Sequence, residues 1–207
     1  MELIISATSP YVRKVRVLVR EGRLLDRVQE IEVVTTAFAP DPVAISANPL
    51  GKIPALIRDN GSPMYDSRSI TRFLDDLAGG GFYPAAPALW DVLTWEATAD
   101  GIMDCAVSMA YEIRLRDPAE RSERWIEAQW SKCEAALDVL AQSAAQSAEL
   151  WRTEALHLGH IGTACMLSFL DFRHGDRQWR TGREPLADWH AVFEKRPSMV
   201  DTAPPPQ

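Results

Sequence analysis

The chain has 207 residues, of which 46% are hydrophobic and 25% are charged, and its formal net charge is −7. These values are typical of a globular protein with one large domain or two smaller ones. Because the charge is negative and no block of like charges occurs, we expect neither nucleic acid nor an anionic membrane as a partner.

The sequence gives no sign that the chain leaves the cytoplasm. Its first residues, MELIISATSP, lack the basic start and the long apolar stretch of a secretory signal. The sequence contains no run of about 18 apolar residues, so we expect no membrane-spanning helix. The three cysteines (Cys105, Cys133 and Cys165) lie far apart, which favours buried thiols in a reducing compartment over a disulfide framework. We therefore expect a cytoplasmic protein.

The first part of the chain alternates patterns typical of strands and of helices. LIIS (residues 3–6) predicts a buried strand, and VQEIEVV (residues 28–34) alternates apolar and acidic residues as a second strand does. Between them, YVRKVRVLVR fits either element, because its valines alternate with charged residues and also line one helical face. Pro10 at the first helical position favours a helix.

A second group of elements follows after a connecting segment. PALIRD (residues 54–59) and PMYDS (residues 63–67) are short strand candidates joined by NGS, which is a hairpin signal. SRSITRFLDDLA (residues 67–78) then repeats apolar residues at helical spacing. The expected order is therefore β-α-β followed by β-β-α.

The second half of the chain shows helix patterns only. Apolar residues from Ile126 to Leu140 recur at intervals of four and three, which marks an amphipathic helix. LGHIGTACMLSFLDF (residues 158–172) is apolar nearly all round, as expected of the central helix of a bundle. A last helix is predicted to be closed by Pro197, and the tail DTAPPPQ is expected to fray.

These patterns predict two domains. Residues 1–78 would form an α/β domain and residues 88–207 an all-α domain. The segment AGGGFYPAAP, with three glycines and two prolines, is typical of a linker, which we place at residues 79–87.

This organisation resembles the cytosolic glutathione S-transferase family, in its bacterial type with serine at the thiol-activating position. The resemblance is carried in chain order by SPYVRKV, NPLGKIPAL, YDSRSI, LSFLDFR and FEKRPSM, and it covers almost the whole chain. It implies a thioredoxin-like N-terminal domain (βαβ-ββα), a helical-bundle C-terminal domain, glutathione as co-substrate, no metal, and a homodimer.

The resemblance assigns glutathione binding to two of these motifs. It implies a cis peptide bond between Ile53 and Pro54, next to Lys52, in a turn that lets the backbone of Ile53 pair with an extended peptide. It also implies that Ser67 binds the α-carboxylate of the γ-glutamyl arm and that Asp66 faces the ammonium of that arm. From the residues alone, a tight turn would explain GKIP equally well, and a helix cap would explain YDSRSI equally well.

Ser9 has two compatible interpretations. Pro10 fits the first helical position, so Ser9 fits the N-cap. The resemblance places the thiol-activating residue here, and a helix N-terminus stabilises a nearby thiolate. We expect Ser9 to bind the glutathione sulfur and to be catalytic, with Thr8 as the nearest rival and Tyr11 as a weaker one. Position 12 is Val12, so the paired thiols of a dithiol reductase are absent.

The residues that would bind an electrophile are not determined by the sequence. The resemblance places such a pocket along the first helices of the second domain, with Tyr11, Met103, Val107 and Tyr111 as candidates. Methionine and aromatic residues at helical spacing indicate a protein core equally well. The substrate class that we expect is a small hydrophobic electrophile.

The segment LHLGHIG departs from the family pattern. The family usually has Ser or Thr and, three residues later, Asp at the start of the central helix, and here His157 and His160 take those positions. A His-x-x-His metal pair is one interpretation, but no third ligand stands nearby in sequence. We predict a weakened cap with two partly exposed histidines and no metal.

The sequence thus predicts a glutathione transferase that adds the glutathione thiolate to a small hydrophobic electrophile, with a role in detoxification. Two alternatives remain open. One is a non-catalytic member of the same fold that binds a ligand or a protein, and the other is a glutathione-dependent isomerase or reductive lyase.

Overall fold

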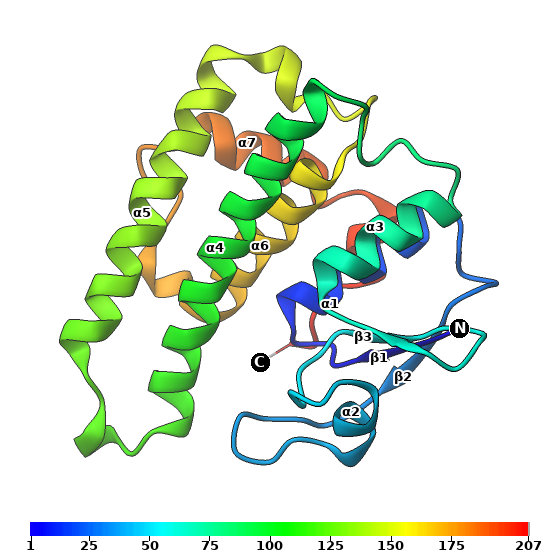
Figure 1. Ribbon diagram of the computed structural model, residues 1–207. Coiled ribbons are helices and arrows are strands. Elements are labelled where there is room, and N and C mark those ends of the chain that lie inside the picture. The colour runs from blue at the N-terminus through cyan, green and yellow to red at the C-terminus, as the bar shows by residue number, and fades with distance from the viewer. Residues whose placement is uncertain (207) are drawn as a thin grey trace. The chain divides into compact units, whose positions relative to one another are not determined.

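The computed structural model describes residues 1–206 (Figure 1). The chain forms two compact units: Ala85–Lys195 makes one, and Met1–Pro84 makes the other together with the segment that begins at Arg196. The sequence pattern predicts that this last segment belongs to the helical domain. It groups with the first unit instead, because helix α8 (Pro197–Val200) packs against helix α1 (Pro10–Glu21).

The first unit is built on a four-stranded sheet in the order β2-β1-β3-β4. Strand β1 (Glu2–Ile5) is parallel to β2 (Gln29–Glu32) and antiparallel to β3 (Ala55–Ile57), which is antiparallel to β4 (Pro63–Met64). All four strands overlap the ranges that the sequence predicted. The order β-α-β followed by β-β-α is also as predicted.

Helices cover both faces of this sheet. Figure 1 shows α1 and α3 (Ser67–Leu77) on one face and the short helix α2 (Pro42–Ala47) on the other. The sequence pattern predicts only a connecting segment where α2 forms. Asp41 starts it, because its carboxylate accepts a hydrogen bond from the N–H of Val43 at 2.8 Å.

Helix α1 confirms the helical interpretation of YVRKVRVLVR. Val12, Val15 and Val19, which share one helical face, are completely buried. On another side of the helix, Arg16 and Arg20 form ion pairs with Glu30 of β2 at 2.9 and 2.8 Å. The valines that could have alternated along a strand thus pack in the core, and the arginines tie the helix to the sheet.

The second unit is helical throughout its regular structure, with α4 (Ala88–Leu115), α5 (Glu123–Gln146), α6 (Leu158–His174) and α7 (Glu184–Phe193). Short 3₁₀ turns follow α4, α5 and α6. As predicted, α6 is the central helix: it is buried on nearly every side, and α4 is the helix packed most extensively against it.

The tail DTAPPPQ, which the sequence predicts to fray, has a packed residue near its beginning. Pro197 begins α8, within which Met199 is only 1% exposed, and Thr202 beyond it is completely buried. The prediction is therefore wrong for Thr202, because this residue contacts Arg13 of α1, far away in the sequence. Residues 203–206 have no regular structure.

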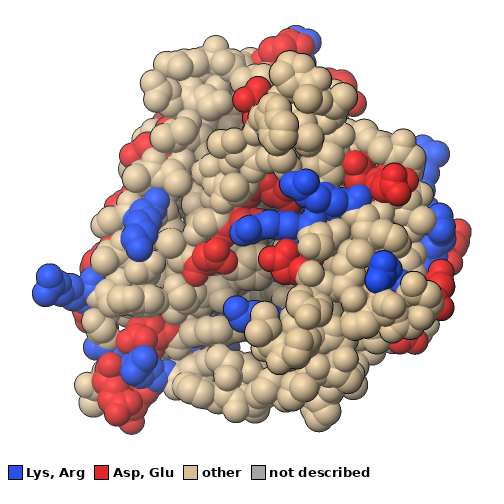
Figure 2. All heavy atoms as spheres, in the orientation of Figure 1, with Lys and Arg blue, Asp and Glu red and all other residues tan. Residues whose placement is uncertain are grey.

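No helix within residues 1–206 has both the length and the apolar character needed to cross a membrane. Figure 2 shows basic and acidic side chains mixed over the face that it displays. This mixture agrees with the absence of charge blocks in the sequence.

Candidate functional site

Three neighbouring strands bring their ends together at one edge of the first unit. Strands β1 and β3 are antiparallel, with Ile4 opposite Ala55. Strands β3 and β4 are also antiparallel, with Leu56 opposite Met64. The carboxyl ends of β1 and β4 therefore lie on either side of the amino end of β3.

The sequence motifs lie at these strand ends. Ser9 follows β1 after a short turn, Ile53 comes just before β3, and Asp66 and Ser67 follow β4. Neighbouring strands are about 4.8 Å apart, so β1 and β4 are separated by about 10 Å. An extended tripeptide has about the same length of 10 Å. The edge can therefore hold a tripeptide-sized ligand across the three strands.

The backbone of Ser9 is held on both sides. Its N–H donates to the C=O of Ser6 at 3.1 Å, and its C=O accepts from the N–H of Arg13 at 3.0 Å. Its Oγ accepts from the N–H of Val12 at 3.4 Å, which makes Ser9 the N-cap of α1. This bond uses a lone pair and leaves the hydroxyl proton able to donate. The side chain is partly exposed beside the helix N-terminus.

The two rival hydroxyl groups are placed differently. The Oγ1 of Thr8 lies 3.5 Å from the Oγ of Ser6, before the helix begins. Tyr11 belongs to the first turn of α1 and is partly buried. Of the three side chains, that of Ser9 is the one that caps the helix, so the geometry distinguishes it from Thr8 and Tyr11.

The peptide bond between Ile53 and Pro54 is cis, as the family resemblance implied. Ala55, the first residue of β3, forms the pair at this end of the ladder with β1. The backbone of Ile53, two residues earlier, therefore lies beyond the ladder. Pro54 is buried, Ile53 is partly buried, and the side chain of Lys52 is exposed. A peptide could extend the antiparallel pairing at this point.

Asn48 holds this turn, a role that was not predicted from the sequence. Its side chain is 2% exposed, donates to the C=O of Lys52 at 2.9 Å and accepts from the N–H of Leu50 at 3.0 Å. Gly51 between them has a φ of +63°, and a Cβ there would lie 3.0 Å from Pro40. The Asn-Pro pair, which is typical of a turn, was the signal that could have revealed this role.

Asp66 and Ser67 start helix α3. Asp66 is exposed and is the N-cap, because its carboxylate accepts from the N–H of Arg68 at 3.1 Å. Ser67 is the first helical residue and is 4% exposed. The first N–H groups and the positive end of the helix dipole attract an anion at such a position. Since Asp66 supplies the cap, the hydroxyl of Ser67 is not needed for capping.

The candidates for electrophile binding differ in their exposure. Tyr11 belongs to the first unit, whereas Met103, Val107 and Tyr111 follow one another at four-residue spacing along α4. Met103 is completely buried, Val107 is partly exposed, and Tyr111 is 46% exposed. Its complete burial leaves Met103 no surface for a ligand, so the prediction for that residue finds no support.

His157 and His160 form a complete capping box at the start of α6. The Nδ1 atom of each ring accepts a hydrogen bond from the backbone N–H of the other residue at 3.4 Å. The rings stack with their centroids 3.6 Å apart, and His160 is only 1% exposed. The prediction of two partly exposed histidines is therefore wrong for His160, whereas His157 is partly exposed. The box is complete, but its two bonds are long, which agrees with a weakened cap. Ring nitrogens replace the side-chain oxygens of the usual box.

The same bonds disfavour a metal pair at these histidines. The Nδ1 of His160 accepts a hydrogen bond, so its Nε2 carries the proton and donates to the C=O of Leu150 at 2.8 Å. Both nitrogens of His160 are thus engaged. In His157, the Nδ1 takes part in the capping box and the Nε2 does not.

The capping box predicts that acid destabilises the fold through His157. Burial, and then repulsion from His160, lowers the pKa of His157 to about 3. Because the unfolded chain binds the proton more tightly, this contribution is present above about pH 6.5 and is lost as pH falls toward 3. Allowing for solvent screening, we expect His157→Asn, which can still cap, to reduce the loss of unfolding free energy between about pH 7.5 and pH 5 by about 1 kcal/mol. Urea unfolding of the wild-type protein and of His157→Asn at the two pH values measures this loss. Equal losses would contradict the electrostatic explanation.

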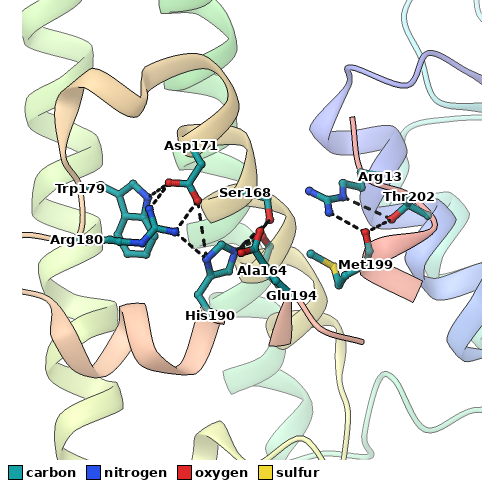
Figure 3. A network of polar contacts seen from close by, with 10 residues as sticks. All are labelled: Arg13, Ala164, Ser168, Asp171, Trp179, Arg180, His190, Glu194, Met199 and Thr202. Atoms are coloured by element: carbon teal, nitrogen blue, oxygen red, sulfur yellow. Dashed lines mark hydrogen bonds and ion pairs between the residues drawn. The ribbon is translucent and has the colours of Figure 1, made fainter. Parts of the chain in front are cut away.

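A second group of possible metal ligands lies in the second unit (Figure 3). Single atoms of Asp171, His190 and Glu194 come within 4.8 Å of one another. The Arg180 guanidinium binds both carboxylate oxygens of Asp171, and the Ser168 hydroxyl donates to Glu194 at 3.0 Å. Asp171 faces Nδ1 of His190 at 4.0 Å, and Glu194 faces Nε2 at 3.6 Å. The carboxylates face opposite ring edges and Asp171 is already paired, so the geometry favours a polar network around the buried His190 over a metal site.

Comparison with known proteins finds a family model for each of the two parts of the chain. The family model described as the glutathione S-transferase N-terminal domain matches residues 8–77, and the model of the glutathione S-transferase C-terminal domain matches residues 123–191. The uncharacterized GST-like protein YibF of Escherichia coli (strain K12) is 30% identical, over 99% of each chain.

Solved structures agree with this assignment. A glutathione transferase family member from Pseudomonas fluorescens Pf-5, with bound glutathione, is 41% identical with a TM-score of 0.93 over 99% of this chain and 98% of that chain. A glutathione S-transferase from Methylobacillus flagellatus KT, also with glutathione bound, is 34% identical with a TM-score of 0.84 over 99% of both chains. The fold class is as predicted, and the chain belongs to the glutathione S-transferase family.

Proposed function

We propose that this protein binds glutathione along the edge formed by β1, β3 and β4 and ionises its thiol for attack on a small hydrophobic electrophile. The observation that supports the proposal most strongly is the meeting of Ser9, Ile53 and Ser67 at the ends of three neighbouring strands. The solved relatives that hold glutathione, at 41% and 34% identity, support the choice of ligand.

Each part of glutathione would have its own place along this edge. The backbone of Ile53 would pair with the cysteinyl unit as an added strand does, in the turn that contains Lys52 and Pro54. The hydroxyl of Ser67 and the first N–H groups of α3 would bind the carboxylate of the γ-glutamyl arm. The exposed carboxylate of Asp66 would face the ammonium of that arm.

Ser9 would supply the catalytic hydrogen bond. A free thiol with a pKa of about 8.5 is only about 3% ionised at neutral pH. Lowering that pKa by about two units requires about 2.7 kcal/mol of preferential stabilisation of the thiolate. A hydroxyl donor together with a helix N-terminus is of the right size for this task. The proton of Ser9 that capping does not use is the donor in this scheme.

The proposal also covers the location, the oligomeric state and the physiological role of the protein. We infer a cytoplasmic homodimer that acts in detoxification, with Tyr11, Val107 and Tyr111 as the residues to test for contact with the electrophile. The alternative functions are a binding protein of the same fold and an isomerase or reductive lyase that uses the same thiolate.

Calorimetry with the purified protein tests glutathione recognition. Glutathione should bind, whereas the dipeptide cysteinylglycine, which lacks the γ-glutamyl arm, should bind much more weakly. Equal affinity for the two compounds would contradict the assignment of Asp66 and Ser67. No binding of either would overturn the proposed function.

A panel of electrophiles then separates transfer from the alternatives. Aryl halides, epoxides and unsaturated carbonyl compounds should form glutathione conjugates if the protein is a transferase. Release of halide with formation of glutathione disulfide would instead identify reductive cleavage. Binding of glutathione without turnover of any compound would favour a binding protein.

A further inference from the structure

A segment at the end of the chain runs along α1. We call residues 196–202 the C-terminal strap. Arg196 contacts Glu21 in the last turn of α1, and Thr202 contacts Arg13 near its beginning. The strap therefore runs antiparallel to α1, toward the end of the helix that carries Ser9.

Arg13, four residues after Ser9 in the sequence, contacts the strap (Figure 3). Its Nη2 donates to the C=O of Met199 at 3.0 Å, and its Nε donates to the Oγ1 of Thr202 at 3.5 Å. Arg13 is 7% exposed, Met199 is 1% exposed, and Thr202 is completely buried. A buried guanidinium is costly unless it is hydrogen-bonded, so these contacts constrain both the side chain and the strap.

The strap is itself fixed at both ends. Thr202 donates to the C=O of Ser198 at 2.7 Å, which closes the turn that Arg13 holds. At the other end, Arg196 binds both carboxylate oxygens of Glu21 at 2.9 Å, and Ser198 donates to the same carboxylate. Burial opposes the ionisation of Glu21, but these hydrogen bonds outweigh it and hold its pKa below the usual range.

Arg13 also belongs to the turn that presents Ser9. The N–H of Arg13 donates to the C=O of Ser9 at 3.0 Å, which is the first hydrogen bond of α1. The cap itself is weak, because the bond from the N–H of Val12 to the Oγ of Ser9 is 3.4 Å long. The first turn of a helix lacks internal partners for its N–H groups and tends to fray. The contact of the Arg13 side chain with the C=O of Met199 is therefore a stronger restraint on this turn than the cap is.

We propose that Arg13 is a positioning residue for thiol activation, because it ties the first turn of α1, and with it the hydroxyl of Ser9, to the C-terminal strap. This inference rests on the proposed function. A hydrogen bond to a thiolate stabilises it only over a narrow range of distance and angle, so a looser first turn weakens the donor without removing it.

The test compares Arg13→Met with Arg196→Met in the full-length protein. Each change removes a strap contact, one near Ser9 and the other at the far end of α1. We expect Arg13→Met to raise the pKa of the bound glutathione thiol by about half a unit to one unit. From a starting pKa of about 6.5, this lowers the thiolate population, and with it kcat/KM, about 1.5- to 3-fold at neutral pH. Activity should recover at alkaline pH. Arg196→Met should lower the melting temperature and leave the thiol pKa unchanged.

Ultraviolet absorbance of the thiolate and the pH profile of kcat/KM measure these effects. Arg13→Lys, which can still donate to the C=O of Met199, should shift the thiol pKa less than Arg13→Met does. If Arg13→Met does not fold, Thr202→Val removes a single hydroxyl and should shift the thiol pKa in the same direction by a smaller amount.

Two failures can be distinguished. If the wild-type protein shows a glutathione thiolate at neutral pH, and Arg13→Met or Thr202→Val changes the melting temperature alone, the strap is purely structural and the inference is overturned. If the wild-type protein shows no thiolate, the proposed function fails, and the role of Arg13 in it fails as well.

Discussion

Ser9→Ala should lower glutathione transfer at neutral pH by about tenfold or more while glutathione stays bound, because each unit of thiol pKa changes the thiolate population about tenfold. Ile53, Asp66 and Ser67 do not depend on the Ser9 hydroxyl and would still hold the peptide. The lost cap should cost about 1 kcal/mol of stability or less, since the bond to the N–H of Val12 is long.

The pH dependence separates catalysis from capping. Without the donor, the bound thiol should titrate at higher pH, so the rate should recover as the pH rises above the new pKa. Thr8→Val is the matched control, since it removes a neighbouring hydroxyl that contacts Ser6 and does not cap α1. It should change neither the titration nor the rate.

A different result would reassign the catalytic group. If Ser9→Ala keeps the wild-type rate and thiol pKa, Ser9 is a helix cap only. Loss of activity in Thr8→Val would then identify Thr8 as the donor. If neither variant changes the rate, Tyr11 or the first N–H groups of α1 would have to supply the stabilisation.

The sequence predicted best those features that local chemistry determines. Pro10 after Ser9 selected a helix for an ambiguous segment, and Asp66 before Ser67 marked the start of α3. Both residues act on neighbours within one helical turn, so their effect is readable without the fold. The cis bond before Pro54 was predicted from the family resemblance, because the residues alone did not determine it.

Features that depend on distant contacts were not predictable from the pattern. The tail was expected to fray as a chain terminus, yet Thr202 is buried and contacts Arg13, 189 positions away. Asn48 looked like part of a loop, and its burial follows only once the turn before β3 is formed. Met103 fitted a pocket and a core equally well by spacing, and only packing distinguishes the two.

The histidines of α6 show a different limit of sequence reasoning. A comparison of residue types predicts a poor cap, because imidazole is not a usual N-cap group. In the structure, the neutral rings of His157 and His160 accept the same two backbone hydrogen bonds that Ser or Thr and Asp would accept. The pairing of the box is thus preserved while its chemistry changes, although both bonds are long at 3.4 Å.

Ser67→Ala should weaken glutathione binding by about 1–3 kcal/mol, a factor of about 5 to 150, through loss of a hydrogen bond to a carboxylate. The fold should survive, because the carboxylate of Asp66 caps α3 and remains in place. Ser69→Ala is the matched control. It makes the same chemical change in the first turn of the same helix, at an exposed side chain that the proposal gives no ligand contact.

Calorimetry with two ligands sharpens this test. Ser67→Ala should lose affinity for glutathione and keep the weak affinity for cysteinylglycine, because the dipeptide has no γ-glutamyl carboxylate to lose. Ser69→Ala should behave like the wild-type protein toward both ligands. A folded Ser67→Ala variant with unchanged glutathione affinity would show that the carboxylate is held by backbone N–H groups or elsewhere. Parallel losses for both ligands would mean that the substitution disturbs the whole strand edge, because a contact specific to the γ-glutamyl arm cannot affect a ligand that lacks it.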